Sequence, residues 1–185
     1  LIHLDIAKLI VDAGGRKAAE RATPPTATEI AASATLCEHA RNALVANDLT
    51  VATKCYAAAA VLNPINANIC IERAGIYYKL RSIGKCIAQC QKAIELAGSQ
   101  GHQARKAGND AAAETHQATL IKAREYLAMV YLLDGDTEAA DEQWDGISKL
   151  GVDPAKSKER LMKVQSGGST MRRRGYSATT AAGAD

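Results

Sequence analysis

Small and apolar residues recur every three or four positions along most of the chain, which is the period of an amphipathic α-helix. Gly and Pro are sparse inside these periodic stretches, and the β-branched and aromatic runs typical of strands are missing. Thr26 and Glu29 form a capping-box pattern directly after Pro25, so we expect a helix from there to about Val45. The pattern therefore predicts an all-α protein.

A repeat of 34 residues runs through the chain. One copy holds a small, an aromatic and a small residue followed by a helix-stopping Pro, at Ala52, Tyr56, Ala59 and Pro64. The positions 34 residues later hold Cys86, Cys90, Ala93 and Gly98, which match them in character. A third copy follows after 54 residues, with Ala140 and Trp144 at the small and aromatic positions. We therefore expect three helix pairs, with an insertion of 20 residues before the third.

A short polar turn separates the two helices of each copy. The turns are Asn47 with Asp48, Arg81 with Ser82, and Gly135 with Asp136. A small residue followed by Tyr three positions later precedes two of these turns, at 74–77 and 128–131. The alternative is a generic helical bundle in which the spacing of these residues is a coincidence. The agreement of three copies at equivalent positions argues against it.

These residues resemble the tetratricopeptide repeat family over about 34–97 and 118–154. The resemblance implies a right-handed superhelical stack of helix pairs, an α-solenoid, with additional N-terminal and C-terminal capping helices. Within an array at 26–154, the repeats are expected at about 34–66, 67–97 and 118–153, with the insertion at 98–117.

The segments outside the array have separate predictions. Residues 1–25 are expected to be an N-terminal helix and a linker, residues 155–165 a capping helix, and residues 166–185 a disordered basic tail. The insertion begins with a Gly-rich polar stretch that we expect to be a loop, and the helix after it should start about two turns early, near Asp110. The insertion is either a docking arm or a tolerated surface insertion.

Positive charge is concentrated near the C-terminal end. The formal net charge is +3, and Arg172, Arg173 and Arg174 account for most of it, so the body is close to neutral. A nucleic-acid partner is not expected, because the body lacks a basic stripe. The Arg triplet is a candidate contact for an acidic surface.

A membrane-spanning helix is not expected, because no run of about 18 apolar residues occurs.

The five cysteines fall inside predicted helices, and their odd number does not suggest a disulfide framework. We interpret them as small apolar core residues in a reducing compartment. Cys86 and Cys90 lie four residues apart, but no second ligand pair lies at zinc spacing.

The sequence also lacks nucleophile, phosphate-loop and dinucleotide motifs. We expect no catalytic residue, cofactor or metal, and a small enzyme with an unrecognised thiol site is the alternative from another class.

In tetratricopeptide arrays the first helix of each pair lines a concave groove where partners bind. The candidate groove residues implied by the resemblance are Arg41, Val45, Asn68, Glu72, Tyr78, Lys79, Lys122, Tyr126, Met129 and Leu133, with Cys37 beside them. Charges of both signs next to Tyr and Met suit a protein partner that presents a helix or an extended segment with apolar anchors.

The layout of two repeats, an insertion and a third repeat is similar to the chaperone-adaptor branch of the family, whose members grip a C-terminal carboxylate with Lys, Asn and Arg. The matching positions here hold Cys37, Arg41, Glu72, Lys122 and Tyr126, so only Lys122 of that clamp is kept. Glu72 in place of a neutral donor is expected to repel a carboxylate.

The sequence therefore favours a non-enzymatic scaffold or adaptor, a subunit of a larger intracellular assembly. We expect a soluble protein in the cytoplasm or in a cytoskeletal, ciliary or organellar complex. A co-chaperone-type module that binds a C-terminal peptide of a heat-shock chaperone is the alternative.

Overall fold

The structure is a computed structural model of the chain, and it describes residues 24–155 and 158–159. The described part contains six α-helices: α2 (Ala27–Val45), α3 (Leu49–Leu62), α4 (Ala67–Lys79), α5 (Ile83–Lys106), α6 (Asp110–Asp134) and α7 (Thr137–Ser148). No strand occurs within it, which confirms the predicted all-α class. Most of the expected N-terminal helix and linker at 1–25, most of 155–165 and the tail with its Arg triplet lie outside the described residues.

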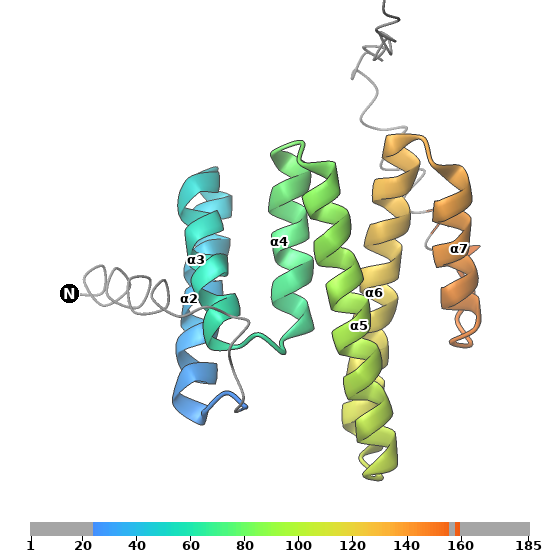
Figure 1. Cartoon of the computed structure of the whole chain (residues 1–185), viewed down its shortest axis with the longest axis horizontal. Coiled ribbons are helices and arrows are strands. Elements are labelled where there is room, and N and C mark those ends of the chain that lie inside the picture. Colours follow the sequence, from blue (N-terminus) through green and yellow to red (C-terminus); the bar gives the residue numbers. More distant parts are fainter. Residues whose placement is uncertain (1–23, 156–157, 160–185) are drawn as a thin grey trace, which may run out of the picture. The chain divides into compact units, whose positions relative to one another are not determined.

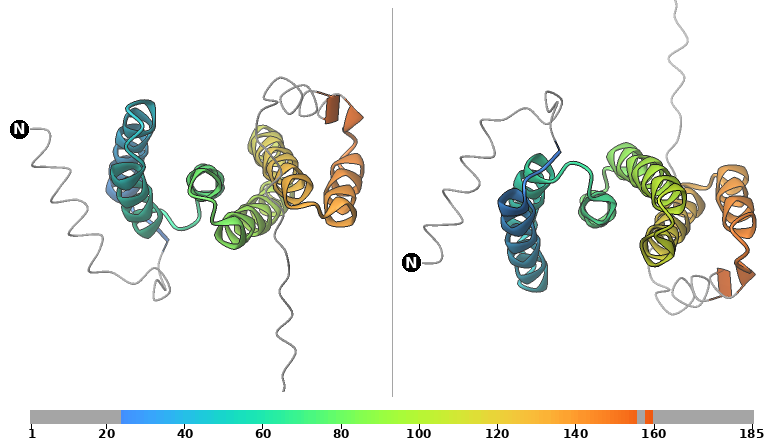
Figure 2. Two further views of the ribbon diagram at one scale, coloured as in Figure 1. Left: turned by 90° about the horizontal axis from the view of Figure 1, so that it is seen from above. Right: turned by 90° about the horizontal axis from the view of Figure 1, so that it is seen from below.

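Within residues 24–152 the helices pack in chain order (Figure 1). α2 packs on α3, α4 on α5, and α6 on α7, while α5 and α6 join the second pair to the third. The views along the helices in Figure 2 show α4 standing between the first pair and α5. Sequential helix pairs of this kind are the architecture that the repeat predicts.

Equivalent positions of the repeat have equivalent surroundings. The small residues Ala52, Cys86 and Ala140 are each 0% exposed, and Tyr56, Cys90 and Trp144 at the aromatic position are 0%, 0% and 3% exposed. Small side chains let two helices approach closely, and the larger side chain one turn later fills the space beside them. The register inferred from the sequence is thus confirmed by burial.

The three predicted turns also share one backbone conformation. The φ angles of Asn47, Arg81 and Gly135 are 59°, 58° and 92°, in the left-handed region. In each turn the next amide donates to a carbonyl five residues earlier, as from Asp136 to Tyr131 at 2.9 Å. This left-handed cap satisfies the free carbonyls at the end of the first helix and reverses the chain for the second.

The beginning of the insertion is helical, so the expectation of a Gly-rich loop there is wrong. α5 continues through Gly98 and Gly101 to Lys106, and Gly98 does not stop it. The cause is packing on α6: Gly101 is buried, and a Cβ built on it would lie 3.4 Å from the Cβ of His116. Tertiary packing outweighs the weak helix propensity of Gly. The predicted early start of α6 is correct, since α6 begins at Asp110.

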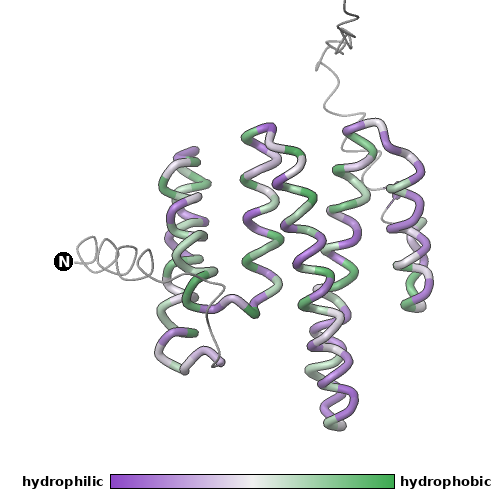
Figure 3. Tube along the Cα trace, in the orientation of Figure 1, coloured by the Kyte–Doolittle hydropathy of each residue, from purple (hydrophilic) through white to green (hydrophobic). Residues whose placement is uncertain are grey.

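As a result, α5 and α6 project past their neighbours at their shared end (Figure 1). Figure 3 shows that these projecting ends are largely hydrophilic. The turn between them repeats the left-handed cap, with Gly108 at φ 68° and Asn109 accepting a hydrogen bond from the amide of Ala112 at 3.1 Å. The insertion therefore lengthens two existing helices and adds no separate element.

Candidate functional site

A cavity of about 480 Å³ opens between the first helices of the three pairs, α2, α4 and α6. We call it the groove pocket, and it is lined by Arg41, Leu44, Tyr56, Ile71, Glu72, Gly75, Tyr78, Lys79, Lys122 and Tyr126. Six of the ten candidate groove residues line it: Arg41, Glu72, Tyr78, Lys79, Lys122 and Tyr126. The structure thus brings together residues up to 85 positions apart in the sequence.

The floor of the groove pocket is apolar and aromatic. Ile71 and Tyr78 come from α4 and Tyr126 from α6. Gly75 lets the two helices approach here, because a Cβ at that position would lie 3.3 Å from the hydroxyl oxygen of Tyr126. Burial raises the pKa of Tyr126, so its hydroxyl remains protonated well above neutral pH and can donate a hydrogen bond to a ligand.

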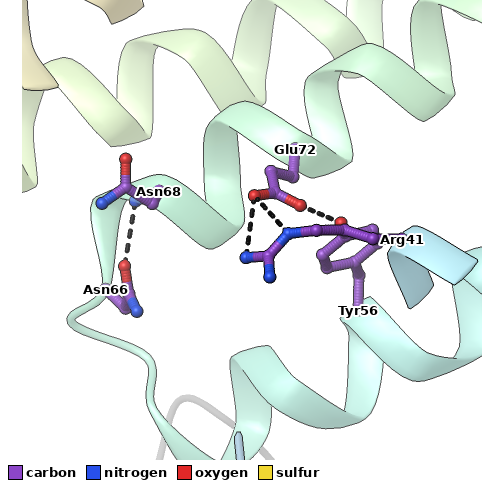
Figure 4. A network of polar contacts seen from close by, with 5 residues as sticks. All are labelled: Arg41, Tyr56, Asn66, Asn68 and Glu72. Carbon is purple, nitrogen blue, oxygen red and sulfur yellow. Dashed lines mark hydrogen bonds and ion pairs between the residues drawn. The ribbon is translucent and has the colours of Figure 1, made fainter. Parts of the chain in front are cut away.

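A three-residue polar network lies beside this floor (Figure 4). Arg41 on α2 donates from Nε and Nη2 to Oε1 of Glu72 on α4, both at 3.2 Å. The hydroxyl of Tyr56 donates to the other carboxylate oxygen of Glu72. The hydrogen bond to Glu72 raises the pKa of Arg41. Both carboxylate oxygens of Glu72 are therefore engaged inside the protein.

Two lysines complete the lining of the groove pocket. Lys79 at the end of α4 and Lys122 on α6 are exposed. Neither makes a salt bridge to another described residue. Since Arg41 and Glu72 cancel each other, the charge of the lining is net positive.

The other candidate groove residues lie elsewhere. Val45 is 89% exposed at the end of α2, while Met129 and Leu133 lie on α6 outside the lining. Asn68 lines a separate cavity. Cys37 was expected beside the groove, but it is buried in the core around Leu36 and Ala40, so that expectation is wrong.

Four lining residues were missed from the sequence: Leu44, Tyr56, Ile71 and Gly75. The helical period could have found three of them, because Leu44, Ile71 and Gly75 each follow a candidate groove residue by three positions. Tyr56 occupies the aromatic position of the repeat, and its ring is buried in the core. Its position gave no sign that the hydroxyl reaches the groove.

Signs of reactive chemistry are weak in the described part of the chain. No group of three His, Cys, Asp or Glu there could hold a metal ion. The five thiols are free and buried. Burial raises the pKa of Cys37 to about 11 and also raises that of Cys70, which keeps these thiols protonated at neutral pH. Among residues 24–155 and 158–159, no helix has the length and apolar character needed to cross a membrane.

Several solved structures share this arrangement of helices. The N-terminal domain of stress-induced protein-1 (STI-1) from C. elegans is similar with a TM-score of 0.58 at 17% identity, over 76% of this chain and 99% of that chain. The chain has a tetratricopeptide-repeat fold. The first tetratricopeptide repeat domain of Spaghetti (RPAP3), solved with the HSP90 peptide SRMEEVD, gives a TM-score of 0.55 at 16% identity over 75% of this chain and 94% of that chain.

The tetratricopeptide-repeat fold is typical of non-catalytic interaction domains. No family model and no curated protein matches the sequence.

Proposed function

We propose that this chain is a protein-interaction module whose groove pocket binds an extended acidic peptide with an apolar anchor residue. The observation that carries the proposal is the uncompensated charge of Lys79 and Lys122 over a floor of Ile71, Tyr78 and Tyr126. Carboxylates of a ligand would pair with the lysines, and its apolar side chain would lie on the tyrosine rings.

Glu72 does not oppose such a ligand as strongly as its charge suggests. Its two oxygens accept hydrogen bonds from Arg41 and Tyr56, and the neighbouring guanidinium compensates the negative charge. A carboxylate that enters the groove pocket would therefore meet a neutral pair and two free ammonium groups. The repulsion expected from the sequence is reduced accordingly.

The tail of a heat-shock chaperone is the first ligand to test. The peptide SRMEEVD, solved with the RPAP3 domain, has three acidic side chains together with Met and Val. This composition is what the groove pocket of the present chain would select. The proposed module is thus closer to a co-chaperone type than to a purely structural scaffold.

A wider adaptor role is the second candidate. Val45 and Leu133 are exposed apolar residues outside the groove pocket, at 89% and 45%. Such residues would extend the contact beyond a short peptide if the partner were a folded protein. The two roles are compatible, because a domain that holds a peptide tail can also contact the body of its partner.

Calorimetric titration with SRMEEVD tests the peptide-binding proposal. We expect micromolar affinity at low salt, and we expect Lys79→Ala and Lys122→Ala each to weaken it by about five- to tenfold. Lys106→Ala, in the projecting end of α5, is the matched control and should leave the affinity unchanged. A peptide with amides in place of all its carboxylates, SRMQQVN with an amidated C-terminus, should bind much more weakly. Equal affinity for the two peptides, or no effect of either lysine, would overturn the proposal.

A further inference from the structure

A second cavity, of about 230 Å³, lies where the connection between α3 and α4 meets α5 and α6. We call it the polar pocket, and it is lined by Ile30, Asn63, Ile65, Asn66, Ala67, Asn68, Gln100, Thr115, His116 and Thr119. The insertion builds one of its walls, since Gln100, Thr115 and His116 all fall within 98–117. Without the lengthened helices this cavity would be open on that side.

Apart from His116, the polar side chains that line the polar pocket are amides and hydroxyls. It includes no Asp, Glu, Lys or Arg, and His116 is its one titratable side chain. A charged ligand would lose its hydration without gaining an opposite charge, which is unfavourable. The polar pocket therefore suits an uncharged ligand that forms hydrogen bonds.

Asn63 is the residue that points to a ligand. It follows α3 directly before Pro64, which disfavours helical backbone at this position, and its side chain is only 8% exposed. Its Oδ1 atom is buried and has no hydrogen-bond partner among the described residues. A buried acceptor without a hydrogen bond lowers the stability of the folded protein. Asn63 also lines the polar pocket, so a donor group of a ligand bound there would be available to this acceptor.

The remaining polar groups supply both acceptors and donors. The hydroxyls of Thr115 and Thr119 donate to carbonyls of their own helix, at 2.9 Å and 3.0 Å, so their oxygens can accept. Gln100 donates from Nε2 to the carbonyl of Ile65 at 2.8 Å, which leaves its Oε1 as an acceptor. Asn66 accepts from the amide of Asn68 through Oδ1, and its NH₂ group can donate.

We infer that the polar pocket is a second binding site that takes a carboxamide, the side chain of an Asn or Gln in a polypeptide partner. A carboxamide carries one acceptor and two donor hydrogens without charge, which matches the lining. The exposed side chains of Ile30 and Ile65 would cover its apolar stem.

The polar pocket continues the groove pocket along α4. Asn68 lines the first and Glu72 the second, and they lie one helical turn apart on α4 (Figure 4). One extended segment could therefore place a carboxamide and an acidic group on the same chain. The inference does not depend on acidic-peptide binding, since the two pockets have different chemistry.

Titration with three small probes, followed by the backbone amide signals of the protein in NMR spectra, tests the inference. The probes are the N-acetyl, N-methylamide derivatives of asparagine, aspartate and leucine, which differ mainly in the side-chain terminus. We expect saturable shifts at Asn68 and Gln100 with the asparagine probe, and binding at least about tenfold weaker with the other two.

Two variants locate the site. Asn63→Ala should abolish the saturable shifts. Thr119→Val keeps the side-chain shape but removes a hydroxyl acceptor, so it should weaken binding about threefold or more. The spectra themselves report whether each variant is folded. Lys122→Ala should bind the asparagine probe normally, so failure here is distinguishable from failure of the groove pocket. Equal binding of the three probes, or shifts that persist in folded Asn63→Ala, would refute the inference.

Discussion

Arg41 on α2 and Glu72 on α4 form an ion pair that bridges the first helices of the first two repeats, with a nitrogen–oxygen distance of 3.2 Å. Their side chains are 57% and 26% exposed, so the pair contributes little to stability. Its main effect is on the groove pocket, where it removes one positive and one negative charge from the surface that a ligand meets.

Glu72→Gln tests this effect. The amide can still contact Tyr56, while Arg41 becomes available to a ligand, so we expect the groove pocket to bind SRMEEVD about three- to tenfold more tightly at low salt. The gain should shrink at high salt because the interaction is screened. Calorimetry at two ionic strengths measures it, with Glu95→Gln on the exposed face of α5 as the control. Weaker binding by Glu72→Gln would show that the carboxylate itself serves the ligand.

Two glycines should respond in opposite ways to substitution by Ala. Gly135 has φ 92°, and Gly98 lies inside α5 with no atom within 4 Å of a built Cβ. Gly135→Ala is therefore expected to lower the free energy of unfolding by about 1 kcal/mol, and Gly98→Ala to raise it by about 0.5–1 kcal/mol. Urea denaturation measures both. A destabilised Gly98→Ala would mean that α5 ends near that residue in solution.

The five buried thiols should react slowly with an alkylating reagent under native conditions. Burial shields all five side chains from the reagent and raises the pKa of Cys37, Cys55 and Cys70, so we expect labelling at neutral pH to be at least about 100-fold slower than in urea. Mass spectrometry at intervals gives the rate for each cysteine. One residue that is labelled rapidly in the folded protein would revive the hypothesis of a reactive thiol site.

Stability should fall as the pH rises above about 9. The pKa of Cys37 rises from 9.0 to about 11 on folding, and that of Tyr126 also rises, both mainly through burial. The unfolded chain loses these protons first, so the free energy of unfolding decreases between the unfolded and folded pKa values. Cys37 alone should account for a loss on the order of 2 kcal/mol by pH 11.

Urea denaturation across this pH range measures the loss of stability. Cys37→Ala removes one titrating group and should show a shallower decrease than the unmodified chain. An unchanged pH dependence in that variant would mean that Cys37 does not contribute to it.

The groove pocket was only partly predictable. Six of its residues followed from the helical face implied by the repeat, whereas Tyr56 enters it from α3, a second helix of a pair. Nothing in the sequence indicates that a core aromatic extends its hydroxyl into a neighbouring groove. The pairing of Arg41 with Glu72 was equally hidden, because the two residues are 31 positions apart on different helices.

The sequence by itself determined the helical class, the register of the helix pairs and the positions of the polar turns between them, because these depend on local periodicity, on small residues at fixed spacing and on turn-forming residues. Tertiary structure alone decided that α5 continues through Gly98, since packing on α6 stabilises a helix that propensity would end. It also decided the charge of the groove pocket. The carboxylate of Glu72 is compensated by Arg41 and hydrogen-bonded by Tyr56, and these residues come together only after the repeats have stacked.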